Sequence, residues 1–121
     1  MTTPVRNPQF IYKIASAENF AAAQAAGTYT GMPIDAEDGF IHFSTAAQLA
    51  ETLSLHFKGQ AGLVLFQVRS ADMGGQLVWE PSRGGQLFPH VYGSFPMSAV
   101  TWQGTVDVGA DGSVTLPEEV A

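Results

Sequence analysis

The chain has 121 residues, a formal net charge of -6 and no cysteine. This length fits one domain over residues 1–121, and an apolar content of 45% with only 13% charged residues excludes a disordered chain. The lack of cysteine excludes disulfides and thiolate chemistry, and a total of five Lys and Arg residues provides no basic stripe for a long nucleic acid.

Composition also limits where the protein is located and what kind of ligand it binds. No apolar run approaches the ~20 residues that a membrane span requires. The first eight residues carry no apolar signal core, so we expect a cytoplasmic protein. A small anion held by backbone amides and one arginine remains a suitable partner, and the sequence gives no indication of the oligomeric state.

The first third of the chain predicts a strand, a helix and a loop. After a short lead-in at residues 1–8, residues 9–14 are rich in β-branched and aromatic side chains and predict a strand. Ser16 is a suitable cap for a helix that extends to Ala26, where Gly27 would end it. Residues 28–38 contain glycine, proline and several acids, which is typical of a loop.

A second strand and helix follow. Residues 39–43 predict the strand, and Thr45 with Gln48 matches a capping box that opens a helix reaching about Lys58. One apolar face of this helix carries Leu49, Leu53, His56 and Phe57.

The second half of the chain predicts mainly strands. Apolar runs at 63–69, 77–80 and 99–108 indicate three of them, and 81–86 is a polar glycine-rich loop. Residues 110–112 predict a hairpin turn that returns to a strand at 114–116. Two helices in the N-terminal half followed by strands indicate an α+β fold with small mixed or antiparallel sheets.

The segment Gly39-Phe-Ile-His-Phe-Ser-Thr45 places His42 and Ser44 on the same face of a strand. A polar pair in an apolar strand is either satisfied locally or positioned for a ligand. A core histidine with one hydrogen bond explains His42 equally well, and Thr45 is better explained as the helix cap.

The segment Phe88-Pro-His-Val-Tyr-Gly93 repeats this spacing with His90 and Tyr92. Pro89 and Gly93 predict a stiff loop that presents an imidazole and a phenol to a ligand. A buried tyrosine that anchors a turn is the alternative.

The remaining polar residues give weaker indications of function. Glu80 ends an apolar strand and is the acid best placed to accept a proton or bind a ribose. Arg83 is explained equally well as a phosphate-binding residue and as an ordinary loop residue. Lys13 alternates with Tyr12, so the two should occupy opposite faces of their strand. His56 is better explained by packing, and the three histidines lack a short metal-ligand spacing.

The whole pattern resembles a bacterial family known as domain of unknown function number 952. The resemblance is carried by Ile11-Tyr-Lys-Ile14, by the two histidine segments and by a glutamate after Trp79, and it covers about residues 10–106. That family is similar in fold to the ADP-ribosyltransferases and the tRNA 2'-phosphotransferases.

The resemblance implies a cleft that takes up NAD, as a substrate rather than a bound cofactor, or an ADP-ribose-like nucleotide. It places His42 and Ser44 at the nicotinamide or ribose, makes Glu80 the counterpart of a glutamate that binds the ribose, and has His90 and Tyr92 close the pocket. We therefore expect His42, Glu80 and His90 to be catalytic, and Lys13, Ser44, Arg83 and Tyr92 to bind the substrate. The leading hypothesis is therefore a transferase or hydrolase acting on such a nucleotide, with no bound metal. The alternatives are a non-catalytic module that binds the nucleotide without turnover, and a metal-assisted hydrolase using His42 and His90.

Overall fold

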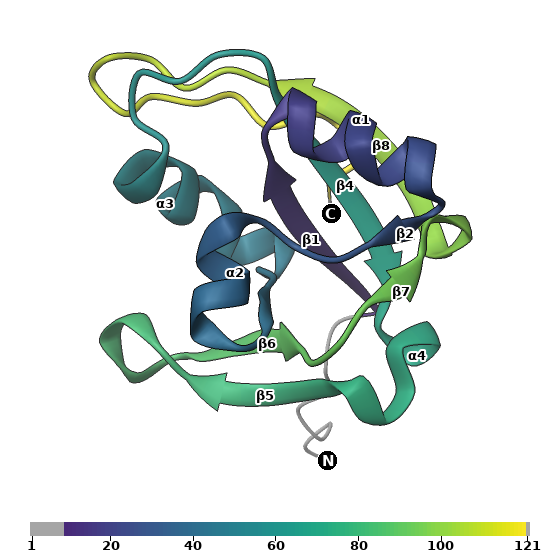
Figure 1. Ribbon diagram of the computed structural model, residues 1–121. Coiled ribbons are helices and arrows are strands. Elements are labelled where there is room, and N and C mark those ends of the chain that lie inside the picture. The colour runs from purple at the N-terminus through teal and green to yellow at the C-terminus, as the bar shows by residue number, and fades with distance from the viewer. Residues whose placement is uncertain (1–8, 121) are drawn as a thin grey trace.

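The computed structural model describes residues 9–120, so the predicted lead-in at 1–8 lies outside the described residues. The chain folds as an α+β structure with small antiparallel sheets (Figure 1). Its strands are β1 (Phe10–Ala15), β2 (Thr28–Tyr29), β3 (Ile41–His42), β4 (Leu63–Arg69), β5 (Leu77–Pro81), β6 (Leu87–Val91), β7 (Phe95–Pro96) and β8 (Val100–Val106). Its helices are α1 (Ala17–Ala26), α2 (Pro33–Asp38), α3 (Ala46–His56) and α4 (Ser70–Met73), with 3-10 turns η1 (Gly74–Gln76), η2 (Arg83–Gly85) and η3 (Met97–Ala99). Within the described range, no helix has the length and apolar character to cross a bilayer.

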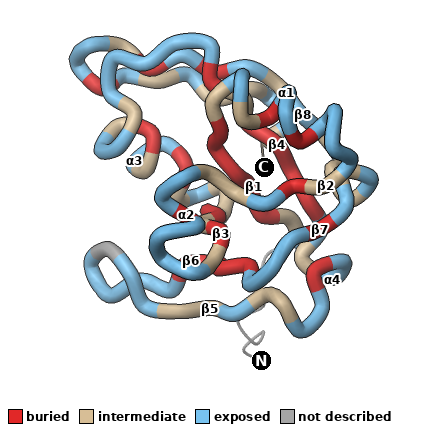
Figure 2. Tube along the Cα trace, in the orientation of Figure 1, coloured by how far each residue is buried: buried red, intermediate tan, exposed pale blue. Residues whose placement is uncertain are grey.

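The main sheet has the order β1-β4-β8, with antiparallel neighbours and β4 in the centre. Both faces of this sheet are covered, which explains why β4 is a nearly continuous apolar run. Figure 2 shows the buried positions concentrated along β1 and β4.

Two hydrophobic clusters lie on the opposite faces of this sheet. One contains Ile11 and Phe66 and is covered by α1 through Phe20. The other contains Tyr12 and is covered by α3 through Leu49 and Leu53. Tyr12 and Lys13 do point to opposite faces, but both are buried, because each face has its own core.

The second three-stranded sheet has the order β3-β6-β5. In its register, Ile41 pairs with Val91 and His42 pairs with His90, and Val78 of β5 lies on the other side of His90. Ile41 and Val91 belong to the first core cluster, so the alternate side chains of this sheet point away from that core.

The predicted helix caps are confirmed. Ser16 Oγ accepts a hydrogen bond of 3.0 Å from the backbone N–H of Asn19, and Gly27 ends α1 in the left-handed conformation. Thr45 and Gln48 form the reciprocal capping box of α3, which ends at His56 rather than at Lys58.

The prediction of a loop over 28–38 was wrong. Residues 28–29 form β2 against β7, and 33–38 form α2, so the described part of the N-terminal half, residues 9–60, contains three helices. Pro33 occupies the first turn of α2, where its missing N–H is not needed, and Asp35 caps that turn. The short α4 was also not predicted.

The prediction of a stiff loop over 88–93 was wrong as well, because β6 is the central strand of its sheet. A central strand seldom tolerates proline, since proline cannot donate to the ladder. The carbonyl of Pro89 accepts from Phe43 N–H at 3.0 Å, on the side where β3 ends. The N–H that Pro89 lacks would point to that same side, so the pairing with β5 is preserved.

The predicted return strand at 114–116 was not found either. The turn before it forms, with hydrogen bonds of 2.8 and 2.9 Å that join Gly109 to Ser113 and Gly112 to Gly109. Residues 114–116 then run without strand pairing, and Val114 and Leu116 pack against the second core cluster.

Candidate functional site

The two histidine segments meet directly. His42 on β3 and His90 on β6 are cross-strand partners, and their ring centroids are 5.3 Å apart at an angle of 75°. Residues directly opposite on antiparallel strands have neighbouring side chains on one face, which explains this contact. The pairing therefore brings together two residues that are 48 positions apart in the sequence (90 - 42).

Glu80 and Tyr92 join His90 on the same face of the sheet. His90 Nδ1 lies 2.7 Å from Glu80 Oε1, and the Tyr92 hydroxyl donates to the same oxygen at 2.7 Å. Glu80 is diagonal to His90, because His90 pairs with Val78, and diagonal neighbours are within reach of long side chains. The hydrogen bond from His90, and next the one from Tyr92, lower the pKa of Glu80, while the carboxylate raises the pKa of Tyr92.

These contacts determine which nitrogen of His90 carries the proton. An ionised Glu80 can only accept hydrogen bonds, so Nδ1 of His90 must be the donor. In the neutral ring, Nε2 then carries a lone pair. His90 is only 4% exposed, and Nε2 has no hydrogen-bond partner within the described structure. Because buried polar atoms are normally paired, this atom is the most conspicuous unsatisfied group of the site.

Phe40 holds the rings of this cluster in place. Its ring stacks on His90 with centroids 4.0 Å apart and an angle of 24°, and it contacts His42 at 4.6 Å and Tyr92 at 5.4 Å. Phe40 lies two positions before His42 and projects from the same side of the chain. The stacking restricts rotation of the His90 ring, which keeps Nδ1 directed at Glu80.

Lys13 is paired with Asp35, which is not among the predicted site residues. Its Nζ lies 2.7 Å from Asp35 Oδ2, and both side chains are almost fully buried. The Asp35 carboxylate also accepts the backbone N–H of Met32 at 2.6 Å and that of His42 at 3.0 Å. Burial lowers the pKa of Lys13, and the attraction of Asp35 opposes that shift. Asp35 thus joins β1, α2 and β3 beside the histidine pair.

The remaining polar residues are held by local contacts. His42 Nε2 lies 2.7 Å from Asp38 Oδ2 at the end of α2. Ser44 forms an isolated bridge with Tyr12, and its hydroxyl lies 3.4 Å from that of Thr52 on α3. Ser44 is therefore anchored to both β1 and α3.

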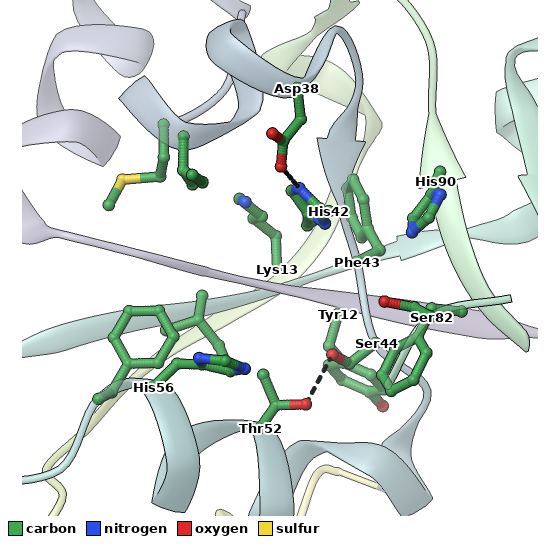
Figure 3. A pocket seen from close by; sticks show the side chains of 15 residues that line it. Tyr12, Lys13, Asp38, His42, Phe43, Ser44, Thr52, His56, Ser82 and His90 are labelled. Atoms are coloured by element: carbon green, nitrogen blue, oxygen red, sulfur yellow. Dashed lines mark hydrogen bonds and ion pairs between the residues drawn. The ribbon is translucent and has the colours of Figure 1, made fainter. Parts of the chain in front are cut away.

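All these elements surround one cavity of about 540 Å³. Four of the predicted site residues line it: Lys13, His42, Ser44 and His90. Figure 3 shows Lys13, His42 and Asp38 on one side of the cavity, and Ser44, Thr52 and His56 on the other. Apolar walls come from Ile14, Met32, Ile34, Phe43, Phe57 and Phe88. A mostly apolar pocket with a few converging polar groups is the usual form of a small-molecule site.

The other predicted residues are placed differently. Glu80 and Tyr92 contact His90 but do not belong to the cavity lining. The backbone of Arg83 begins η2, and its side chain lies outside the described structure. Across residues 9–120, no group of three or more His, Asp or Glu side chains is arranged to hold a metal ion, so the metal-assisted alternative has no ligand set there.

Residues 14–103 match the family described as "Protein of unknown function (DUF952)". The chain belongs to this family. The DUF952 match begins one residue after Lys13 and includes His42, Glu80 and His90.

Solved structures resemble this DUF952 protein closely. The crystal structure of protein CC0527 from Caulobacter crescentus has a TM-score of 0.82 at 44% identity, covering 88% of this chain and 93% of that one. A crystal structure of a CC0527 double mutant has a TM-score of 0.82 at 45% identity with the same coverage. The solution NMR structure of CC0527 has a TM-score of 0.77 at 45% identity, covering 88% and 91%. No curated protein matches the chain significantly.

Four residues of the candidate site were missed from the sequence: Asp35, Asp38, Phe40 and Thr52. A signal for Asp35 was present, since Pro33 followed by an acid two residues later is typical of a first helical turn. Asp38 lies four residues before His42, a spacing that has meaning only once α2 is recognised. Phe40 carried no distinctive signal, because an aromatic residue in an apolar strand is more often part of a core.

Proposed function

We propose that the cavity binds NAD or an ADP-ribose-like nucleotide, that the fold is of the ADP-ribosyltransferase type, and that the protein catalyses transfer or hydrolysis at the ribosyl carbon. The expected likeness in fold between the DUF952 family and that class supports this proposal, and so does a cavity of about 540 Å³. Aromatic walls suit a nucleobase or nicotinamide ring, and the hydroxyls of Ser44 and Thr52 suit a ribose.

The single observation that carries the proposal is the unpaired Nε2 of His90. A carboxylate at Nδ1 orients the ring and stabilises its positive form, so that Nε2 can take a proton from a substrate. His90 lines the cavity and is 4% exposed. With Nδ1 held by Glu80 and Nε2 unpartnered, its ring is suited to act as a general base.

In the proposed reaction, an oxygen of water or of an acceptor hydroxyl attacks the ribosyl carbon. His90 Nε2 takes the proton from that oxygen, and the bond to nicotinamide breaks, with its electron pair leaving on the nicotinamide nitrogen. Glu80 acts through His90, whose imidazolium it stabilises. It is thus a positioning residue rather than a group that touches the ribose.

NAD turnover by purified protein tests this function. We expect release of nicotinamide by the wild type, a loss of about 10²- to 10⁴-fold in His90→Gln, and a smaller loss in Glu80→Gln. Glu118→Gln, which changes an exposed carboxylate in the C-terminal segment, serves as the matched control. No nicotinamide release by folded wild-type protein across a panel of acceptors would remove the enzymatic proposal.

One observation favours the alternative of a binding module without turnover. Lys13 is neutralised by Asp35, and Glu80 is occupied by His90 and Tyr92 outside the cavity lining, so neither is available for direct contact with the reacting carbon. Isothermal titration calorimetry with NAD and ADP-ribose separates the two. Binding without turnover supports the module, and the absence of binding contradicts both.

A further inference from the structure

Two histidines line the cavity side by side, and each is held by a different carboxylate. His42 Nε2 lies 2.7 Å from Asp38 Oδ2, and His90 Nδ1 lies 2.7 Å from Glu80 Oε1. Their ring centroids are 5.3 Å apart, and both residues belong to the cavity lining. The NAD reaction described above uses His90 alone and gives His42 no chemical role.

The two imidazoles differ in environment, and this difference assigns them different roles. His90 is buried, and Nε2 carries the lone pair of the neutral ring, which is the state of a base. The side chain of His42 is 37% exposed, and its Nε2 is held by the Asp38 carboxylate, so Nδ1 is the ring nitrogen left to donate a proton to a substrate. Imidazole is the side chain that can adopt either state near neutral pH.

We propose that His42 and His90 act as an acid–base pair for hydrolysis of a cyclic ribose phosphodiester. In this step a water oxygen attacks phosphorus while His90 Nε2 takes its proton. The bond from phosphorus to one ribose oxygen breaks, and the His42 imidazolium protonates that oxygen. Water and the cyclic diester become a ribonucleoside monophosphate, and the two rings exchange protonation states, which solvent then restores.

The charges and hydroxyls of the cavity fit this substrate class. Lys13 and Asp35 neutralise each other, so the Lys13 ammonium does not compete with the two histidines for the phosphate of a ligand. A cyclic phosphodiester carries a single negative charge, which the imidazolium of His42 can match. Ser44 and Thr52 lie across the cavity from His42 (Figure 3), where they can contact the ribose and base of a ligand whose phosphate lies against the histidines.

Hydrolysis of 2',3'-cyclic AMP in the presence of EDTA tests the pair. We expect conversion to a 2'- or 3'-nucleotide by the wild type, and a loss in kcat of about 100-fold or more in His42→Gln and in His90→Gln. Glu118→Gln should retain full activity. No conversion by the wild type, or activity that persists in either histidine variant, would overturn the proposal.

A second measurement avoids dependence on variants that fail to fold. Long-range ¹H–¹⁵N NMR of the wild-type imidazoles should place the proton of the neutral His90 ring on Nδ1. A proton on Nε2 of the neutral ring would contradict the assignment of His90 as base. Nicotinamide release from NAD is scored in the same preparations. Failure of that reaction alone counts only against the function proposed above, because the acid–base pair does not depend on it.

Discussion

Lys13 and Asp35 form an ion pair of 2.7 Å in which both side chains are almost completely removed from water. The pair connects the face of β1 that carries Ile11 and Ala15 to the first turn of α2. Asp35 also binds the backbone N–H of His42, so the position of β3 depends on the same carboxylate. The position of His42, and with it the geometry of the histidine pair, therefore depends on the Lys13–Asp35 ion pair, which lies outside the β3-β6-β5 sheet.

Asp35→Ala should destabilise the protein by about 3–5 kcal/mol, because it leaves the Lys13 ammonium buried without a partner. Lys13→Met should cost less, since Asp35 keeps its two backbone donors. Urea unfolding followed by circular dichroism gives both values, and Glu119→Ala, at an exposed carboxylate, is the control. Equal costs for the two variants would show that the unpaired ammonium is not the main penalty.

Gly31→Ala should disturb the same carboxylate from the opposite side. A Cβ at Gly31 would lie 2.9 Å from Asp35 Cβ, and the φ of +103° is unfavourable for an L-residue. Gly27→Ala is the matched control, because its φ is +81° but nothing lies within 4 Å of the added atom. We expect the Gly31 variant to have the lower thermal unfolding temperature of the two. Equal unfolding temperatures would mean that Asp35 can move without cost.

Glu80→Gln should alter the response of stability to acid. The pKa of folded Glu80 lies below its ordinary value of 4.5, first because His90 donates a hydrogen bond to the carboxylate and then because Tyr92 does. A lowered pKa stabilises the folded state above about pH 4.5, and this contribution is lost as the pH falls through the folded value. Urea midpoints between pH 3 and 7 should therefore show a wild-type advantage that shrinks in acid. An advantage that stays constant with pH would contradict the assignment.

Tyr92→Phe should raise the pKa of Glu80 toward its ordinary value while leaving it lowered. The variant removes one hydrogen-bond donor from Oε1, and His90 still supplies the other. A ¹³C NMR titration of the Glu80 side-chain carboxyl measures this directly. An unchanged or lower pKa would mean that the Tyr92 hydroxyl does not bind the carboxylate in solution.

The local signals in the sequence proved the most reliable. Ser16, Gly27, Thr45 and Gln48 act through neighbours only a few residues away, so caps and helix bounds could be read from the chain alone. Pro89 shows the limit of such reasoning. Its effect depends on which neighbour its missing N–H would face, and that is decided by strand order rather than by local sequence.

The sequence by itself determined the α+β composition, the two long helices, the apolar central strand and the histidine segments. Only the tertiary structure decided that His42 and His90 are direct cross-strand partners, that Glu80 reaches the cavity through His90, and that Lys13 is neutralised by Asp35. The physical reason is the separation along the sequence between the residues that interact. Caps and periodicity are set by neighbours along the chain, whereas strand register and buried ion pairs are chosen by the free energy of packing segments that are distant in sequence.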